Sequence, residues 1–63
     1  MVVTFNFWNK DGSEYMLVKD IDFIPIVGDD ILYKERWYTV SKRAFDFDTG
    51  RYTKIHCNQT TDN

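Results

Sequence analysis

Hydrophobic and polar residues alternate along the first eight residues of the chain. Val3, Phe5 and Phe7 are separated by single residues, which is the period of a strand with one buried face. An Asp-Gly pair follows within residues 10–13, and Asp-Gly between two alternating segments is a strong hairpin signal. Residues 14–19 then supply the return strand. The pattern predicts a β-hairpin at the start of the chain.

The length of this first turn decides which side chains of the return strand face the core. A two-residue turn places Met16 and Val18 on the core face. A three-residue turn with Gly12 in the left-handed conformation places Tyr15 and Leu17 there instead, because a slip of one residue exchanges the two faces of a strand. The sequence leaves both alternatives open.

The segment from Asp20 to Gly28 shows no clear period, and it contains the only proline of the chain, Pro25. Proline cannot donate to a sheet ladder, so we expect a packed connection rather than a strand. Gly28 suits a corner that needs a positive φ. We expect the apolar residues of the connection to close one end of the core: Phe23, Ile24, Ile26 and Val27.

A second hairpin is predicted from residues 31–33 and 36–40, joined by a two-residue turn at Lys34-Glu35. This turn pairs Ile31 with Tyr38 and Leu32 with Trp37. The predicted core face carries Ile31, Tyr38 and Val40, and the opposite face carries Leu32 and Trp37.

A third hairpin turns at Asp48-Thr49-Gly50, with Gly50 in the left-handed position of a three-residue loop. This loop pairs Phe45 with Thr53 and Arg43 with Ile55, and it predicts one face made of Phe45, Phe47, Ile55 and Cys57. Val40 and Phe45 have opposite parity, so both can face inward only if the strand is bulged between Ser41 and Ala44. No segment shows sustained helical spacing.

These elements predict an all-β fold, a small five-stranded antiparallel bent sheet that curls into a small barrel. We expect one domain over residues 1–57 and a frayed polar tail over residues 58–63. The corner Pro25-Ile26-Val27-Gly28-Asp29, followed by Trp37-Tyr38-Thr39-Val40, resembles short SH3-like proteins of phage and bacterial mobile elements. The resemblance covers residues 22–57. It implies a binding or assembly role and carries over no functional residue.

Composition narrows the class of protein. In a chain of 63 residues a single cysteine excludes an internal disulfide, and the aromatic content of 17% provides the alternative of a dense aromatic core. The net charge is −2, against the basic footprint of most nucleic-acid-binding domains. We find no signal peptide, and the longest apolar run, residues 23–27, is far too short to span a bilayer. We therefore expect a cytoplasmic protein without a membrane partner.

The sequence lacks the residue combinations that catalysis usually needs. His56 and Cys57 are neighbours on a predicted strand, so their side chains point to opposite faces and form no direct dyad. One histidine and one cysteine do not make a zinc site. We expect no enzymatic activity, no metal and no cofactor.

A mixed aromatic and basic face is the better candidate for function. Exposed Trp, Tyr and Arg side chains have the composition of a protein-interface hot spot. We expect a non-catalytic protein-interaction module, such as an accessory factor or inhibitor derived from a phage or mobile element, with a protein partner or a second copy of the chain as its ligand. The alternative is weak binding of single-stranded nucleic acid, in which aromatic rings stack on bases. The candidate binding surface consists of Leu32, Arg36, Trp37, Arg43, Tyr52, Lys54 and His56.

Overall fold

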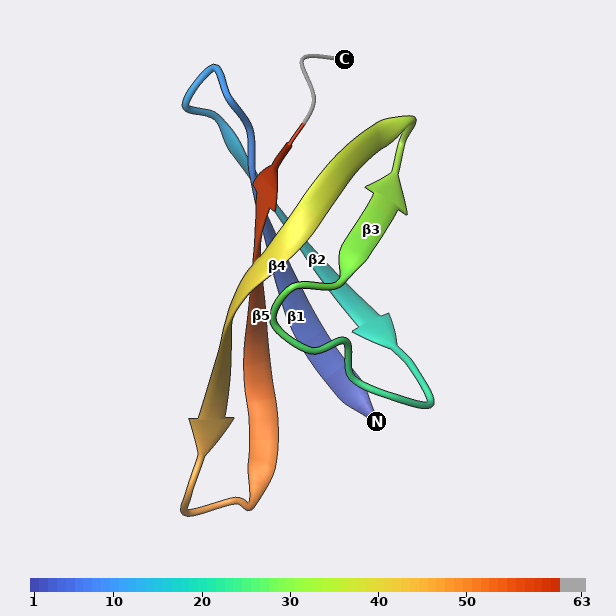
Figure 1. The fold of residues 1–63 in the computed structure, drawn as a ribbon. Helices are drawn as coiled ribbons and strands as arrows, with labels where there is room; N and C mark the ends of the chain where they lie inside the picture. Colours follow the sequence, from blue (N-terminus) through green and yellow to red (C-terminus); the bar gives the residue numbers. More distant parts are fainter. Residues whose placement is uncertain (61–63) are drawn as a thin grey trace.

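The computed structural model describes residues 1–60, which form an all-β fold of five strands in one sheet (Figure 1). The strand order is β2-β1-β5-β4-β3, and the sheet curls into a half-barrel. None of the described residues belongs to a helix that could cross a membrane. The five strands are β1 (Val2–Trp8), β2 (Glu14–Asp20), β3 (Asp30–Tyr33), β4 (Arg36–Asp46) and β5 (Arg51–Gln59).

The expectation of a purely antiparallel sheet is wrong, because β1 and β5 pair in parallel at its centre. The other three pairs are antiparallel hairpins, which adjacent segments form through short turns. A parallel pair needs a long connection, and here β2, β3 and β4 together provide it. The sheet is therefore mixed. The strands that come first and last in the sequence, β1 and β5, lie side by side (Figure 1).

The core lies on the inner face of this curled sheet. Phe5 stands opposite Ile55 of β5 and Leu17 of β2, and Phe7 stands opposite Cys57. Aromatic rings pack closely within the core, since the centroid of the Phe7 ring lies 4.7 Å from that of Tyr38. The sequence expectation is confirmed for Phe5, Phe7, Val40 and Ile55. The buried core consists of Val3, Phe5, Phe7, Tyr38, Val40, Ile55 and Cys57.

The first hairpin adopts the longer of the two turns that the sequence left open. The backbone N–H of Asn9 donates to Ser13 O at 2.8 Å, which closes a three-residue turn with Gly12 at φ 91°. Tyr15 therefore stands opposite Phe7, and Leu17 opposite Phe5. Met16 and Val18 lie on the outer face and are exposed.

The second hairpin matches its prediction. Ile31 pairs with Tyr38 and Leu32 with Trp37, across a two-residue turn at Lys34-Glu35. Both turn residues have positive φ, 49° and 65°. This is the arrangement of a type I′ turn, which suits the twist of a two-stranded ribbon.

The third hairpin differs from its prediction. The predicted bulge after Val40 is present, but a second register shift between Ala44 and Phe45 pairs Phe45 with Tyr52 instead of Thr53. This part of the hairpin extends beyond the core, so Phe45 is 52% exposed and Phe47 is 90% exposed. The assignment of these two phenylalanines to the core is therefore wrong. Gly50 has the predicted positive φ, 70°.

The end of β5 continues past the predicted domain boundary at residue 57. Asn58 pairs with both Thr39 and Trp8, and the backbone N–H of Thr60 donates to Trp37 O at 2.9 Å. Residues 58–60 thus extend the sheet rather than forming part of a frayed tail. The remainder of the predicted tail, residues 61–63, lies outside the described residues.

The connection between β2 and β3 closes the core only in part. Ile21 and Ile24 pack against the core, but Phe23, Ile26 and Val27 are exposed, contrary to expectation. The physical reason is that the backbone of the Gly28 corner pairs with β4. Gly28 N donates to Val40 O at 2.9 Å, and Val40 N donates to Asp29 O at 2.9 Å.

Candidate functional site

The seven residues of the predicted binding surface do not gather in one place. Leu32 and Trp37 stand opposite each other on β3 and β4, with exposed fractions of 58% and 45%. This confirms that both residues are turned away from the core. Lys54 and His56 lie on the outer face of β5, with the buried Ile55 between them.

The electrostatics around His56 are those of a basic strip. Burial, together with the charges of Lys42 and Lys54, lowers the pKa of His56 below its ordinary value of 6.5. Lys42 is its cross-strand neighbour on β4. The imidazole is therefore neutral at physiological pH and adds no positive charge to this strip.

Arg43 and Tyr52 form a separate cluster near the tip of the third hairpin. The guanidinium carbon of Arg43 lies 4.2 Å from the centre of the Tyr52 ring, which is a cation–π contact. Phe45 packs edge-on against the same ring at 5.0 Å. Arg43 stands opposite Ile55 in the ladder, so this cluster extends the inner face rather than the face of Lys54 and His56.

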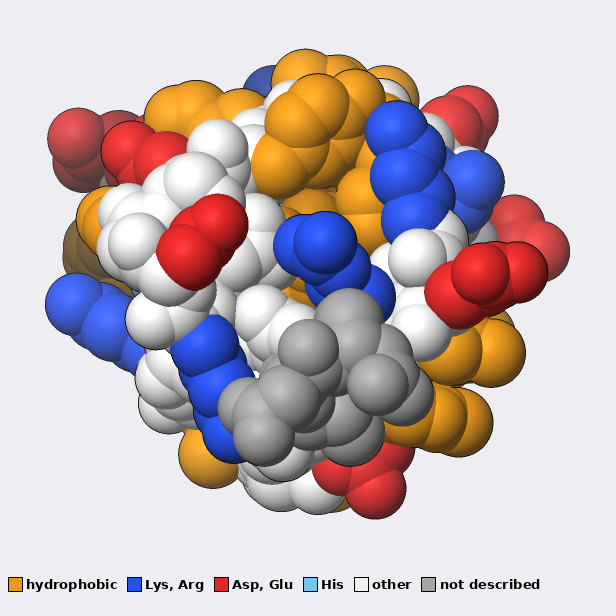
Figure 2. All heavy atoms as spheres, turned by 90° about the horizontal axis from the view of Figure 1, so that it is seen from above, with side chains coloured by type: hydrophobic (Ala, Val, Ile, Leu, Met, Phe, Trp, Pro, Cys, Tyr) orange, Lys and Arg blue, Asp and Glu red, His pale blue; other side chains and the backbone are white. Residues whose placement is uncertain are grey.

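Arg36 lies at the opposite end of the molecule, beside the β3–β4 turn. It lines a shallow hollow with Lys10, Asp11 and Gln59. Figure 2 looks onto this end and shows hydrophobic side chains flanked by Lys, Arg, Asp and Glu side chains of mixed charge. The predicted surface is thus distributed over several parts of the sheet.

The structure instead contains an apolar groove between β2 and β3. These two strands stand at the ends of the strand order, so within the described residues each has a neighbour on one side only. The groove has a volume of about 240 Å³ and lies where a closed barrel would have its seam. Its lining is apolar except for one lysine: Phe5, Phe7, Leu17, Lys19, Ile21, Phe23, Pro25, Ile31, Leu32 and Tyr33.

Aromatic contacts bridge the two strands at one end of the groove. The rings of Tyr15 on β2 and Tyr33 on β3 stack with centroids 5.9 Å apart. The Lys34 ammonium lies 5.2 Å from the first ring centre and 5.5 Å from the second. Desolvation, together with the Tyr15 hydroxyl, raises the pKa of Tyr33. The Tyr33 hydroxyl therefore stays neutral. The side chains of Tyr15, Tyr33 and Lys34 close this end of the groove.

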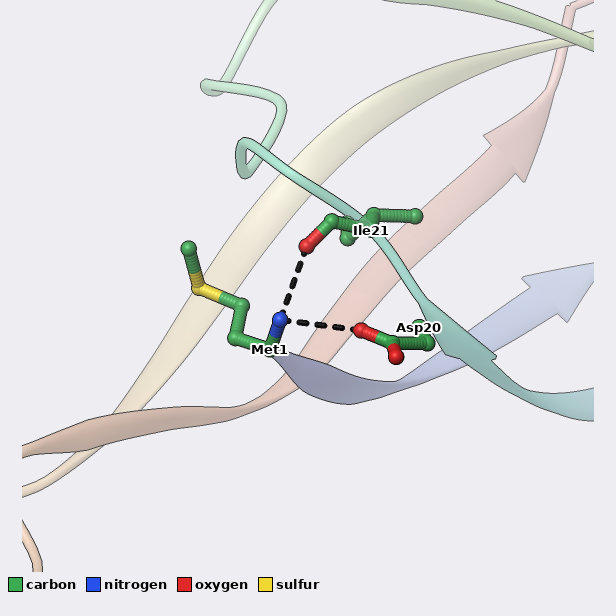
Figure 3. A network of polar contacts seen from close by, with 3 residues as sticks. All are labelled: Met1, Asp20 and Ile21. Atoms are coloured by element: carbon green, nitrogen blue, oxygen red, sulfur yellow. Dashed lines mark hydrogen bonds and ion pairs between the residues drawn. The ribbon is translucent and has the colours of Figure 1, made fainter.

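Polar contacts shape the other end of the groove, where β2 ends. The amino group of Met1 donates to Asp20 Oδ1 at 2.9 Å and to Ile21 O at 3.0 Å (Figure 3). Ile21 N donates in return to Met1 O at 2.9 Å. The exposed ion pair adds little stability by itself. The three contacts together hold the start of the connection against β1 and direct Ile21 towards the groove.

Exposed hydrophobic side chains surround this groove. Phe23 is 73% exposed although it contributes to the groove lining, and Leu32 borders the groove from β3. Ile26 and Val27 are exposed on the same connection. Apolar side chains concentrated around a concave site are typical of a surface that binds another molecule.

The prediction from sequence identified Leu32 but missed the groove. Its lining comes from β1, β2, β3 and the connection, and only the strand order reveals that β2 and β3 are both edges. One local signal was present, since Phe23 to Val27 is an apolar run without strand or helix period.

Nucleophilic chemistry has no support in the geometry. Burial raises the pKa of the Cys57 thiol to about 11, the opposite of the shift that activates a cysteine. His56 points to the other face of β5, as predicted. Among the described residues no three His, Cys, Asp or Glu side chains form a group that could hold a metal ion.

Comparison with protein families, with curated proteins and with solved structures finds no match for this chain.

Proposed function

We propose that this protein is a non-catalytic protein-interaction module, and that the groove between β2 and β3 is its binding site. The apolar groove, open between two strand edges that lack a further neighbour within residues 1–60, is the observation that carries this proposal. Protein surfaces that bury large apolar side chains in a concave patch are typical interaction sites.

Selection of binders from a displayed random-peptide library tests this proposal. The groove variant is Phe23→Ser, which replaces an exposed apolar residue of the groove lining, and the control is Phe47→Ser. Phe47 is 90% exposed and lies outside the groove, so the control changes surface hydrophobicity without changing the site. Melting curves establish that both variants are folded before binding is measured.

We expect the selected peptides to bind the groove variant at least about tenfold more weakly than the parent, which corresponds to the loss of a few apolar contacts. The Phe47→Ser protein should bind like the parent. Equal binding by parent and groove variant contradicts the proposed site. Tight binding of a single-stranded oligonucleotide with a steep salt dependence would instead indicate nucleic-acid binding as the function.

A further inference from the structure

The turn between β1 and β2 contains the only Asp-Gly pair of the sequence, Asp11-Gly12. Both residues are exposed, and a Cβ added at Gly12 would meet no atom within 4 Å. In such a pair no side chain shields the backbone nitrogen of the glycine from the carboxyl carbon of the aspartate. The pair therefore has the space and the access to water that closure of a cyclic imide requires.

Ring closure at this pair would rearrange the backbone. The nitrogen of Gly12 attacks Cγ of Asp11, a C–N bond forms, and the carboxyl hydroxyl leaves with the amide proton as water. Water then adds to the resulting succinimide. Attack on Cγ restores aspartate, whereas attack on the backbone carbonyl carbon of Asp11 gives isoaspartate, in which the chain runs through the β-carbon. Water is the only co-reactant, and no atom is oxidised or reduced.

Hydrogen bonds to the carboxylate oppose the first step. Asp11 Oδ1 accepts from the hydroxyl of Ser13, and it accepts from the backbone N–H of Ser13 at 2.8 Å. The hydroxyl contact and then the N–H contact lower the pKa of Asp11 below its ordinary value of 3.8. The carboxylate thus stays ionised at neutral pH, and an ionised carboxylate resists attack by nitrogen. Asn9 Nδ2 donates to the Ser13 hydroxyl at 3.1 Å and fixes its position.

The backbone of the turn opposes the same step at the nitrogen. The N–H of Gly12 donates to Asn9 O at 3.0 Å, which closes a β-turn over residues 9–12. Asn9 N donates to Ser13 O at 2.8 Å and closes the hairpin around this turn. Because the imide nitrogen carries no proton, the bond from Gly12 must break before the ring can form.

We propose that Asp11 is the site at which this chain converts to isoaspartate, and that Ser13 holds the reaction back while the hairpin is folded. The product has one additional backbone carbon between Asp11 and Gly12. A change of turn length disturbs the register of a hairpin, and here the register places Tyr15 opposite Phe7. The modification therefore loosens β2, the strand that borders the groove.

Incubation of the full chain at neutral pH, with isoaspartate measured by chromatographic peptide mapping, tests the proposal. Ser13→Ala removes the hydroxyl, and Ser13→Thr is the matched control that keeps it. The parent and both variants are incubated in native buffer and in denaturant, and circular dichroism establishes that the native samples are folded. Hydrogen exchange of the Asn9 amide, which donates to Ser13 O, reports whether the turn stays closed.

We expect the native parent to react at least about tenfold more slowly than the denatured parent, because the folded turn must open first. Native Ser13→Ala should react about two- to tenfold faster than the native parent, the range expected from one exposed hydrogen bond. Native Ser13→Thr should react like the parent. In denaturant all three chains should react at the same rate.

Three results would overturn the proposal. Isoaspartate that forms first at another residue contradicts the assignment to Asp11. Equal rates in native and denatured parent, or in native parent and native Ser13→Ala, contradict the protective role of Ser13. An increase in exchange of the Asn9 amide by the same factor as the isomerisation rate assigns the effect to opening of the turn and also contradicts that role.

Discussion

The β3–β4 turn makes a quantitative prediction about stability. Lys34 and Glu35 both have positive φ, 49° and 65°, although neither is glycine or asparagine. Left-handed backbone costs an L-residue about 1–2 kcal/mol, because Cβ approaches the following carbonyl oxygen. Glycine has no Cβ and adopts this conformation freely. The substitution Glu35→Gly should therefore relieve strain in the folded state.

The expected gain in folding free energy from Glu35→Gly is smaller than the strain energy that the substitution removes. Glycine also gains about 0.5–1 kcal/mol of conformational freedom in the unfolded chain, which opposes folding. The difference is a stabilisation of about 0.5–1 kcal/mol. For a domain of this size it corresponds to a rise in melting temperature of about 2–8 °C. Glu35 is the better position to change, because Lys34 also contacts the Tyr15 and Tyr33 rings.

Thermal and urea denaturation, followed by circular dichroism, measure this change. The control is Glu35→Ala, which removes the same side chain but keeps a Cβ at positive φ. We expect the glycine variant to be more stable than the parent and the alanine variant to be no more stable. If glycine and alanine have the same effect, the side chain rather than the backbone strain is responsible, and the reasoning is refuted.

Two titratable residues of β5 make further predictions. Cys57 is buried, and its pKa is raised to about 11. Iodoacetamide should therefore alkylate it at neutral pH only as fast as the domain opens, and at least about a hundredfold faster in denaturant. Rapid labelling of the native protein would contradict its burial. The pKa of His56 is lowered in the folded state, so the unfolded chain binds the proton first. Stability is therefore full above pH 6.5 and falls as the pH drops through and below that value, and His56→Gln should flatten this part of the stability–pH curve. An unchanged slope in the variant assigns the pH dependence to other groups.

Local signals predicted the hairpins well. The alternation of Val3, Phe5 and Phe7 and the turn at Lys34-Glu35 each depend on residues close in sequence, and the structure confirms them. The left-handed Gly12 was one of two options, and the geometry of a three-residue turn decides between them. In each case, turn length and strand period determine which residues face each other.

Local sequence signals did not predict the pairing of strands that are far apart in the chain. The parallel pair of β1 and β5 joins residues about fifty positions apart, and nothing in either strand specifies its neighbour's direction. Phe45 was misplaced because a second register shift follows Ala44, and a bulge has no reliable mark in a single sequence. The groove depends on both features: on the strand order that makes β2 and β3 the edges, and on the exposed side of their connection.

The protection of the two edges supports a specific use of the groove. A free apolar edge promotes aggregation, and proteins usually shield it with charges, short strands or side-chain cover. Here β3 is short, and the tyrosine stack with Lys34 covers one end. In the part of the chain that the structure describes, the seven residues of β2 pair on one side only, and Lys19 is the charged residue of the groove lining. The groove thus combines one shielded end with an open apolar border, and the loss of peptide binding in the groove variant is the result that tests its use most directly.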